Sequence, residues 1–144
     1  MDDAWREVTG EWIGEYAFIA RNRTGRTVQM GTFGDKSGLS PMELLLASVA
    51  GCTGADVVDI LTKKRQPPEA LQVKVRGKRV DTFPRIYEEI EVLYLIWGNG
   101  IDPLAVEQAI KLSEEKYCSV SAMLRGVAEI RSSYKVLAPG EVVD

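Results

Sequence analysis

Two cysteines are the side chains best suited to chemistry in this chain of 144 residues, which contains no histidine. Without an imidazole, one chain cannot build a Ser-His-Asp or Cys-His catalytic unit, or a metal site that uses histidine. Cys52 and Cys118 are also too few for a structural zinc site, so we predict no metal and no cofactor. The remaining roles for two thiols are packing as small residues or acting as a reversible redox pair.

Cys52 lies in an apolar stretch, close to Gly51 and Gly54. One interpretation is a buried cysteine beside glycines that allow close helix contact. The other is a nucleophilic thiol, whose pKa must be lowered by a nearby cation or by hydrogen-bond donors. Asp56, one helical turn further on, would raise that pKa if it faced Cys52. The activating cation must therefore come from elsewhere, and arginine is the strongest choice in this chain.

Cys118 stands where one predicted helix ends and a short one begins. The N-terminus of a helix stabilises a thiolate, which favours a reactive thiol at this position. Packing as a small residue is the alternative. The two cysteines are 66 positions apart (118 minus 52), and this spacing does not predict whether they meet in space.

A long helix is predicted from Pro41 to about Lys64. Ser40 is typical of an N-cap, Pro41 of a first helical residue, and Glu43 completes a Ser-x-x-Glu capping box. After Glu43 the helix is apolar on nearly every side, which is typical of a helix inside a core. One small sheet covers only one side of such a helix. We therefore predict a homodimer, with the long helices of two copies at its centre.

Patterns of alternation, turn residues and helix caps assign the other segments. Residues 12–20 alternate as one aromatic-rich strand that pairs with residues 27–30. The whole chain, 1–144, is predicted to be a single α+β domain in which an antiparallel sheet wraps around the long buried helix. Its predicted parts are N-terminal strands and a loop (1–39), the central helix (41–64), two strands (70–97), helices (102–125) and a last strand (127–136).

Composition limits the partners. A net charge of −3 and a pI near 5.1 argue against nucleic acid as a main partner. The acidic start of the chain lacks the apolar core of a signal peptide. The longest uncharged run, residues 44–55, falls short of the roughly 18 residues of a membrane span. We therefore expect a soluble, cytoplasmic protein.

Two cysteine motifs together resemble those of the OsmC/Ohr family, the osmotically inducible and organic hydroperoxide resistance proteins. The first runs Ser-Pro-Met-Glu-Leu-Leu-Leu-Ala-Ser-Val-Ala-Gly-Cys over residues 40–52, and the second runs Lys-Tyr-Cys-Ser-Val over residues 116–120. The resemblance extends from the first hairpin to Val136. Ser-Pro-x-Glu-Leu-Leu-Leu, with the later Pro84-Arg85-Ile86, is most similar to the OsmC-like branch of the family.

The resemblance implies an intertwined, swapped homodimer with its active sites between the subunits. It also implies a thiol peroxidase that acts in oxidative stress defence. Cys52 would be the peroxidatic residue, which attacks an organic hydroperoxide and becomes a sulfenic acid. Cys118 would be the resolving residue, which forms a disulfide with Cys52 that a dithiol reductant reopens.

Two features depart from the family pattern. The characterised hydroperoxidases have a carboxylate directly after the helix-opening proline, where this chain has Met42. Glu43 lies one position later, about 100° round the helix, and its capping role is the alternative to a catalytic one. The family's activating arginine comes from an early hairpin. Arg23, with Thr24 and Gly25, resembles that turn, while Arg21 and Arg26 remain alternatives.

Two other functions remain open alongside the peroxidase. One is a non-catalytic binding protein that holds a small apolar or thiol-reactive ligand at the dimer interface. The other is a redox sensor whose disulfide changes a contact with a partner.

Overall fold

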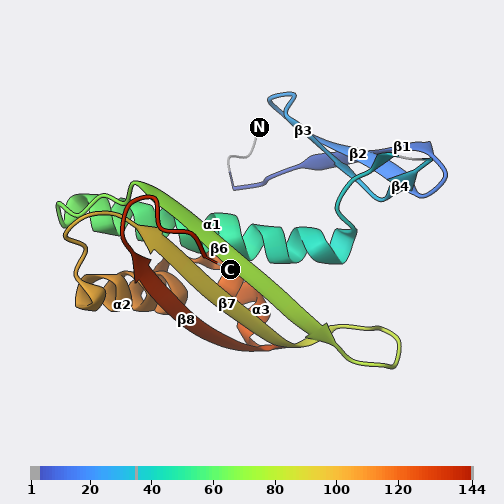
Figure 1. Cartoon of the computed structure of the whole chain (residues 1–144). Helices are drawn as coiled ribbons and strands as arrows, with labels where there is room; N and C mark the ends of the chain where they lie inside the picture. The colour runs from blue at the N-terminus through green and yellow to red at the C-terminus, as the bar shows by residue number, and fades with distance from the viewer. Residues whose placement is uncertain (1–3, 35, 144) are drawn as a thin grey trace. The chain divides into compact units, whose positions relative to one another are not determined.

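The computed structural model describes residues 4–34 and 36–143. The chain forms two compact units, Met1–Leu45 and Leu46–Asp144 (Figure 1). The prediction of a single domain over 1–144 stays a prediction. Residues 1–3, which contributed to the expectation of no signal peptide, lie outside the described residues.

The first unit contains a three-stranded antiparallel sheet and a small two-stranded one. The strands are β1 (Val8–Gly14), β2 (Ala17–Asn22), β3 (Thr27–Met30), β4 (Thr32–Phe33) and β5 (Lys36–Ser37). The prediction of one strand over 12–20 is wrong, because this segment contains the end of β1, a turn at residues 15–16 and the start of β2. Gly14 has a φ of 126° and Glu15 a φ of 46°, and backbone in this left-handed region ends a strand.

Helix α1 runs from Pro41 to Lys63, one residue short of its predicted end. The backbone N–H of Ser40 donates to Glu43 Oε1 at 2.9 Å, and the N–H of Glu43 donates to Ser40 Oγ at 3.0 Å. These reciprocal bonds confirm the predicted capping box. After the helix, Arg65 has a φ of 63° and reverses the chain ahead of the two prolines.

The second unit holds a three-stranded sheet in the order β6 (Ala70–Arg79), β7 (Tyr87–Trp97), β8 (Glu129–Leu137). Between β7 and β8 the chain forms α2 (Pro103–Leu112), the π-helix η1 (Ser113–Tyr117) and α3 (Ser119–Arg125). The α+β class is confirmed. An antiparallel arrangement is correct for β6 and β7 but wrong for β8, which pairs parallel to β7. The helices between β7 and β8 carry the chain back to the end of the sheet at which β7 begins, so that β8 runs in the same direction as β7.

One face of this sheet packs against the helices. Alternate residues of β7 point to that face, and four of them, Ile90, Val92, Tyr94 and Ile96, are at most 1% exposed. Helix α1 lies beside β6, while α2 and η1 lie beside β8 (Figure 1). The C-terminal segment covers the end of the sheet near Trp97. There the indole N–H of Trp97 donates to the carbonyl of Glu141 at 2.6 Å, so the C-terminal segment folds back over the strand ends.

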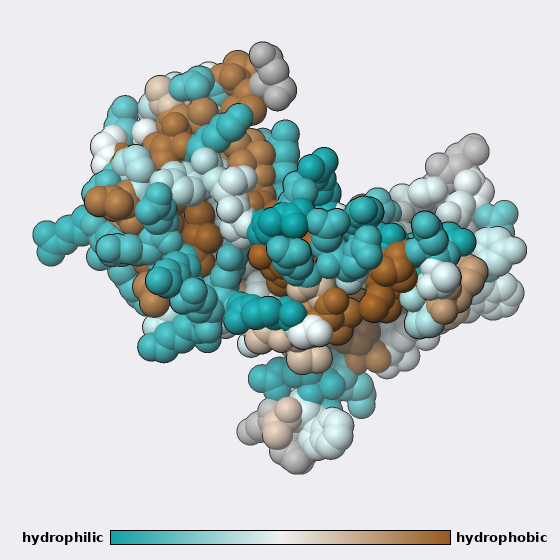
Figure 2. Space-filling model, turned by 90° about the horizontal axis from the view of Figure 1, so that it is seen from below, coloured by the Kyte–Doolittle hydropathy of each residue, from teal (hydrophilic) through white to brown (hydrophobic). Residues whose placement is uncertain are grey.

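Only part of α1 is buried within one chain. Its buried side is formed by Val49, Thr53, Gly54, Val57 and Leu61. The most apolar 18-residue window has a mean hydropathy of 1.7, and 28% of it is buried. By length and composition α1 is therefore long enough to cross a membrane, which the length of the uncharged run did not indicate. The core helix of a soluble protein meets the same criterion. Apolar surface remains open on the face shown in Figure 2.

Candidate active site

The second unit brings the two thiols together. Cys52 lies on α1, and Cys118 lies between η1 and α3. The two side chains are within hydrogen-bonding reach of each other, and both thiols are free. Cys118 is 2% exposed, whereas Cys52 is half-buried. The fold thus joins two residues that the sequence left 66 positions apart.

Both sulfur atoms face the first turn of α3, of which Cys118 is the N-cap. The backbone N–H of Val120 lies close enough to the sulfur of Cys52 to lower its pKa. The N–H and the hydroxyl of Ser121 donate to Cys118 Sγ at 3.3 Å and 3.2 Å. Free N–H groups make the beginning of a helix electropositive, and this favours negative charge on a nearby sulfur. The predicted position of Cys118 at a helix start is confirmed, whereas the part played by Ser121 was not foreseen.

The pKa of the Cys52 thiol is raised above its ordinary value. Burial is the largest cause, followed by the hydrogen bond to Cys118 and then by the charges of Cys118 and Asp56. The N–H of Val120 acts in the opposite direction. The expectation that Asp56 would raise this pKa is therefore confirmed. No cation is among the leading groups, within the described residues, that set this pKa.

A π-helical turn leads directly into Cys118. The N–H of Cys118 donates to the carbonyl of Ser113 at 2.7 Å, which closes the turn. Ser113 is fully buried, and its Oγ donates to Asp56 Oδ2 on α1 at 2.8 Å. π-Helices are rare and often mark functional sites. The sequence gave no sign of this wider turn.

Glu114, the next residue, joins the same turn to the sheet. Its Oε1 accepts hydrogen bonds from Tyr94 Oη at 2.9 Å and from Ser132 Oγ. The phenol of Tyr94 also lies within hydrogen-bonding reach of the Thr53 hydroxyl on α1. Tyr94 is fully buried, and burial raises its pKa well above the ordinary value, so that it remains a donor. This polar network was missed because its members come from four separate elements.

Arg23 and Glu43 belong to the first unit. Arg23 lies in the exposed turn between β2 and β3, where Asn22 Oδ1 accepts from the N–H groups of Thr24 and Arg26. Glu43 is exposed and serves as the cap of α1. The second unit forms the thiol pair by itself, and the roles of Arg23 and Glu43 at that pair stay predictions.

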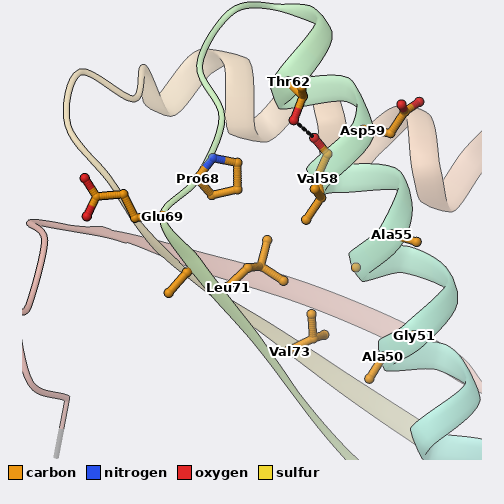
Figure 3. Close-up of a pocket in the computed structure, with 12 residues that line it drawn as sticks. Ala50, Gly51, Ala55, Val58, Asp59, Thr62, Pro68, Glu69, Leu71 and Val73 are labelled. Atoms are coloured by element: carbon orange, nitrogen blue, oxygen red, sulfur yellow. Dashed lines mark hydrogen bonds between the residues drawn. The ribbon is translucent and has the colours of Figure 1, made fainter.

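A separate apolar groove of about 860 Å³ runs between α1 and β6 (Figure 3). The helix contributes small residues such as Gly51, Ala55 and Val58, and the strand contributes Leu71 and Val73. The thiols do not line this groove. Helix α1 thus presents one side to the thiol site and another to the groove. Among residues 4–34 and 36–143, no group of three His, Cys, Asp or Glu side chains could hold a metal ion.

The fold and the site together define an α+β protein with two juxtaposed thiols at the start of a short helix. The sequence profile of the OsmC-like protein family matches residues 34–133. The chain is 37% identical over 129 residues to Protein YhfA of Escherichia coli K12. The matched region covers 89% of this chain and 96% of that protein. The chain therefore belongs to the OsmC-like protein family.

Solved structures agree with this assignment. A protein of Aquifex aeolicus VF5 is 41% identical, with a TM-score of 0.84, over 93% of this chain and 97% of that one. The organic hydroperoxide resistance protein OsmC of Legionella pneumophila shares the fold, with a TM-score of 0.69 at 13% identity over 94% of this chain and all of that one. The organic hydroperoxide resistance protein OhrB of Bacillus subtilis also shares the fold, with a TM-score of 0.61 at 16% identity over 91% of this chain and 98% of that one.

Proposed function

We propose that this protein is a thiol-dependent peroxidase that reduces organic hydroperoxides in cytoplasmic oxidative stress defence. The observation that carries the proposal is the juxtaposition of Cys52 and Cys118 at the first turn of α3. The Cys52 thiolate attacks the terminal peroxide oxygen, the O–O bond breaks, and the alcohol leaves as Cys52 becomes a sulfenic acid. Cys118 then forms the disulfide and releases water, and a dithiol returns both thiols to the reduced state.

Burial supports the assignment of the two roles. Cys52 is half-buried and accessible to a small molecule, whereas Cys118 is 2% exposed. A peroxide therefore reaches Cys52 first. Cys118 needs to reach only the sulfenic acid, which forms beside it. A resolving thiol that is shielded in this way is also protected from direct oxidation.

Activation of Cys52 requires a cation from outside the second unit. Within that unit, burial and the neighbouring groups raise the pKa of Cys52, and a protonated thiol is a poor nucleophile. Arg23 is our candidate, because its turn resembles that of the family's activating arginine. A guanidinium beside the sulfur would lower the pKa and would also stabilise the oxygen that leaves.

The proposal includes a homodimer that completes this site. Most of the apolar window of α1 is uncovered in one chain, and an apolar groove lies beside it. A Cβ placed on Gly51 would meet no atom within 4 Å, so the helix surface is open there. A second copy packed on this face would bury it, and a swapped arrangement would bring the N-terminal unit of one copy to the thiols of the other.

The test is peroxide consumption by the purified protein, with cumene hydroperoxide as oxidant and dithiothreitol as reductant. We expect catalytic turnover by the wild type and none by Cys52→Ser. Cys118→Ser should react once and then hold a sulfenic acid that dimedone traps. Consumption by the wild type no faster than by Cys52→Ser would contradict the peroxidase assignment.

A binding protein that uses the same site without turnover is the second candidate. Glu43, which is next in sequence to the position of the family's catalytic carboxylate, caps the helix. The raised pKa of Cys52 also favours an unreactive thiol. Native mass spectrometry of the purified protein distinguishes the two. A co-purified small ligand, together with a Cys52 that peroxide leaves unmodified, would support the binding protein.

A further inference from the structure

Two contacts join α1 to the η1 turn, one helical turn apart. The first is the contact between the thiols of Cys52 and Cys118. The second joins Asp56 Oδ2 to Ser113 Oγ at 2.8 Å. Along α1 these contacts are separated by four residues, which is one α-helical turn. Along the other segment they are separated by five residues, one π-helical turn, closed by the 2.7 Å bond from the N–H of Cys118 to the carbonyl of Ser113.

These links form a closed ring. Its sides are the turn from Cys52 to Asp56 and the turn from Ser113 to Cys118, and its ends are the two contacts. In such a ring, the position of one end determines the position of the other. The ring contains no long flexible side chain, and Ser113 is fully buried.

A second anchor holds the π-helical turn from the side of the sheet. Glu114 follows Ser113 and accepts hydrogen bonds from Tyr94 on β7 and Ser132 on β8. Consecutive residues of the turn are thus tied to α1 and to the sheet. The start of the turn has little freedom to move, and Cys118 lies at its end.

We propose that Asp56 and Ser113 are positioning residues for the thiol pair. Their hydrogen bond fixes the π-helical turn so that Cys118 lies against Cys52, and thereby sets how readily the two sulfurs form a disulfide. Neither residue touches the peroxide. The inference deepens the proposed thiol chemistry, but it concerns the geometry of the pair and can be measured without any peroxide.

The primary test is the effective concentration of the two thiols, measured by equilibrium titration of the full chain against reduced and oxidised dithiothreitol. In this exchange the cyclic disulfide gains two electrons and two protons as Cys52 and Cys118 lose them. Loss of this part-buried hydrogen bond should lower the effective concentration roughly tenfold in Ser113→Ala and in Asp56→Ala. The double variant should fall no further than either single one, because both remove the same bond.

A matched pair of variants separates position from charge. Asp56→Asn keeps an oxygen that accepts from Ser113 Oγ but removes the negative charge, whereas Asp56→Ala removes both. Positioning predicts that Asn retains the wild-type effective concentration to within about twofold and that Ala does not. Equal losses in the two variants would overturn the inference. The control is Ser133→Ala, which replaces an exposed serine on β8, away from the Asp56–Ser113 hydrogen bond.

Thermal unfolding of the reduced proteins shows whether a variant has lost structure in general. A variant that melts as the wild type does and still loses effective concentration supports positioning. Unchanged effective concentration in both Ser113→Ala and Asp56→Ala would overturn it. A wild-type chain that turns over no peroxide would contradict the proposed function while leaving this titration interpretable.

If the peroxidase is active, a kinetic readout follows. Dimedone should trap more sulfenic acid in Ser113→Ala than in the wild type, because resolution by Cys118 is slower. The rate at which peroxide oxidises Cys52 should not fall, because Cys118 raises the pKa of Cys52 and its displacement weakens that effect. An oxidation rate that falls as much as the resolution rate would contradict a role confined to positioning Cys118.

Discussion

Glu43 Oε1 accepts the backbone N–H of Ser40 at 2.9 Å, and Ser40 Oγ accepts the N–H of Glu43 at 3.0 Å. This exchange satisfies two N–H groups at the start of α1 that have no partner within the helix. The carboxylate of Glu43 thus caps the helix that carries Cys52. A catalytic role for Oε1 would require this oxygen to leave the cap.

Replacement of Glu43 should therefore affect stability more than chemistry. Glu43→Ala should lower the free energy of unfolding by about 0.5–2 kcal/mol, the usual range for loss of a helix cap. Glu43→Gln keeps an acceptor oxygen and should retain both stability and the rate of peroxide reduction. Denaturant unfolding and peroxide kinetics measure the two effects. A Gln variant with native stability and a strongly reduced rate would instead assign Glu43 to catalysis.

The pH dependence of Cys52 alkylation should reveal the activating cation. Burial and Cys118 raise the pKa of this thiol. Once Arg23 is replaced by alanine, we expect the rate of iodoacetamide reaction to have its midpoint above about 8.5, the value for a free thiol. The wild type should have a lower midpoint, and Arg21→Ala should match the wild type. Equal midpoints for Arg23→Ala and the wild type would exclude Arg23 as the activator.

The raised pKa of Cys52 predicts how the stability of Arg23→Ala changes with pH. The folded thiol of Cys52 then has a higher pKa than the unfolded one, so folding favours its protonated form. Its contribution to stability is complete below the unfolded pKa and is lost as pH rises through the folded pKa. Unfolding midpoints in denaturant should therefore fall from pH 8 towards pH 10. Cys52→Ser in the same background should show a smaller fall over this range.

Val58 should be essential to the proposed dimer. It lines the groove on α1 and is 40% exposed in one chain. In Val58→Glu a charge would be buried between the two copies, so we expect a monomer by size-exclusion chromatography with light scattering. Leu104→Glu, at a position on α2 that is 64% exposed, is the matched control and should leave the assembly unchanged. A dimer that persists in Val58→Glu would exclude this face as the interface.

Gly77 on β6 should tolerate no larger residue. A Cβ at this position would lie 2.5 Å and 2.6 Å from atoms of the Tyr87 ring, which is itself buried. Gly77→Ala should therefore cost about 1–3 kcal/mol in the free energy of unfolding, the usual penalty for overpacking. Gly126→Ala is the control, because its Cβ would meet no atom within 4 Å. Similar stabilities for the two variants would contradict this packing.

The local signals in the sequence were reliable where a few neighbouring residues determine the structure. The capping box of Ser40 and Glu43 formed as predicted, and Cys118 caps α3 at the predicted break. The strand prediction over 12–20 failed because alternation continues through Gly14 and Glu15, whose left-handed backbone turns the chain. Alternation reports which side chains share a face and does not detect such a turn.

The sequence alone determined the family motifs, the cap of α1, the excess of apolar surface on that helix and the absence of histidine chemistry. Each of these depends on residue type and short spacing. Only the tertiary structure decided that Cys52 and Cys118 meet, that β8 runs parallel to β7, and that Asp56 holds Ser113. These contacts join residues far apart in the chain, where pairing depends on how whole helices and strands pack and not on the pattern of any one segment.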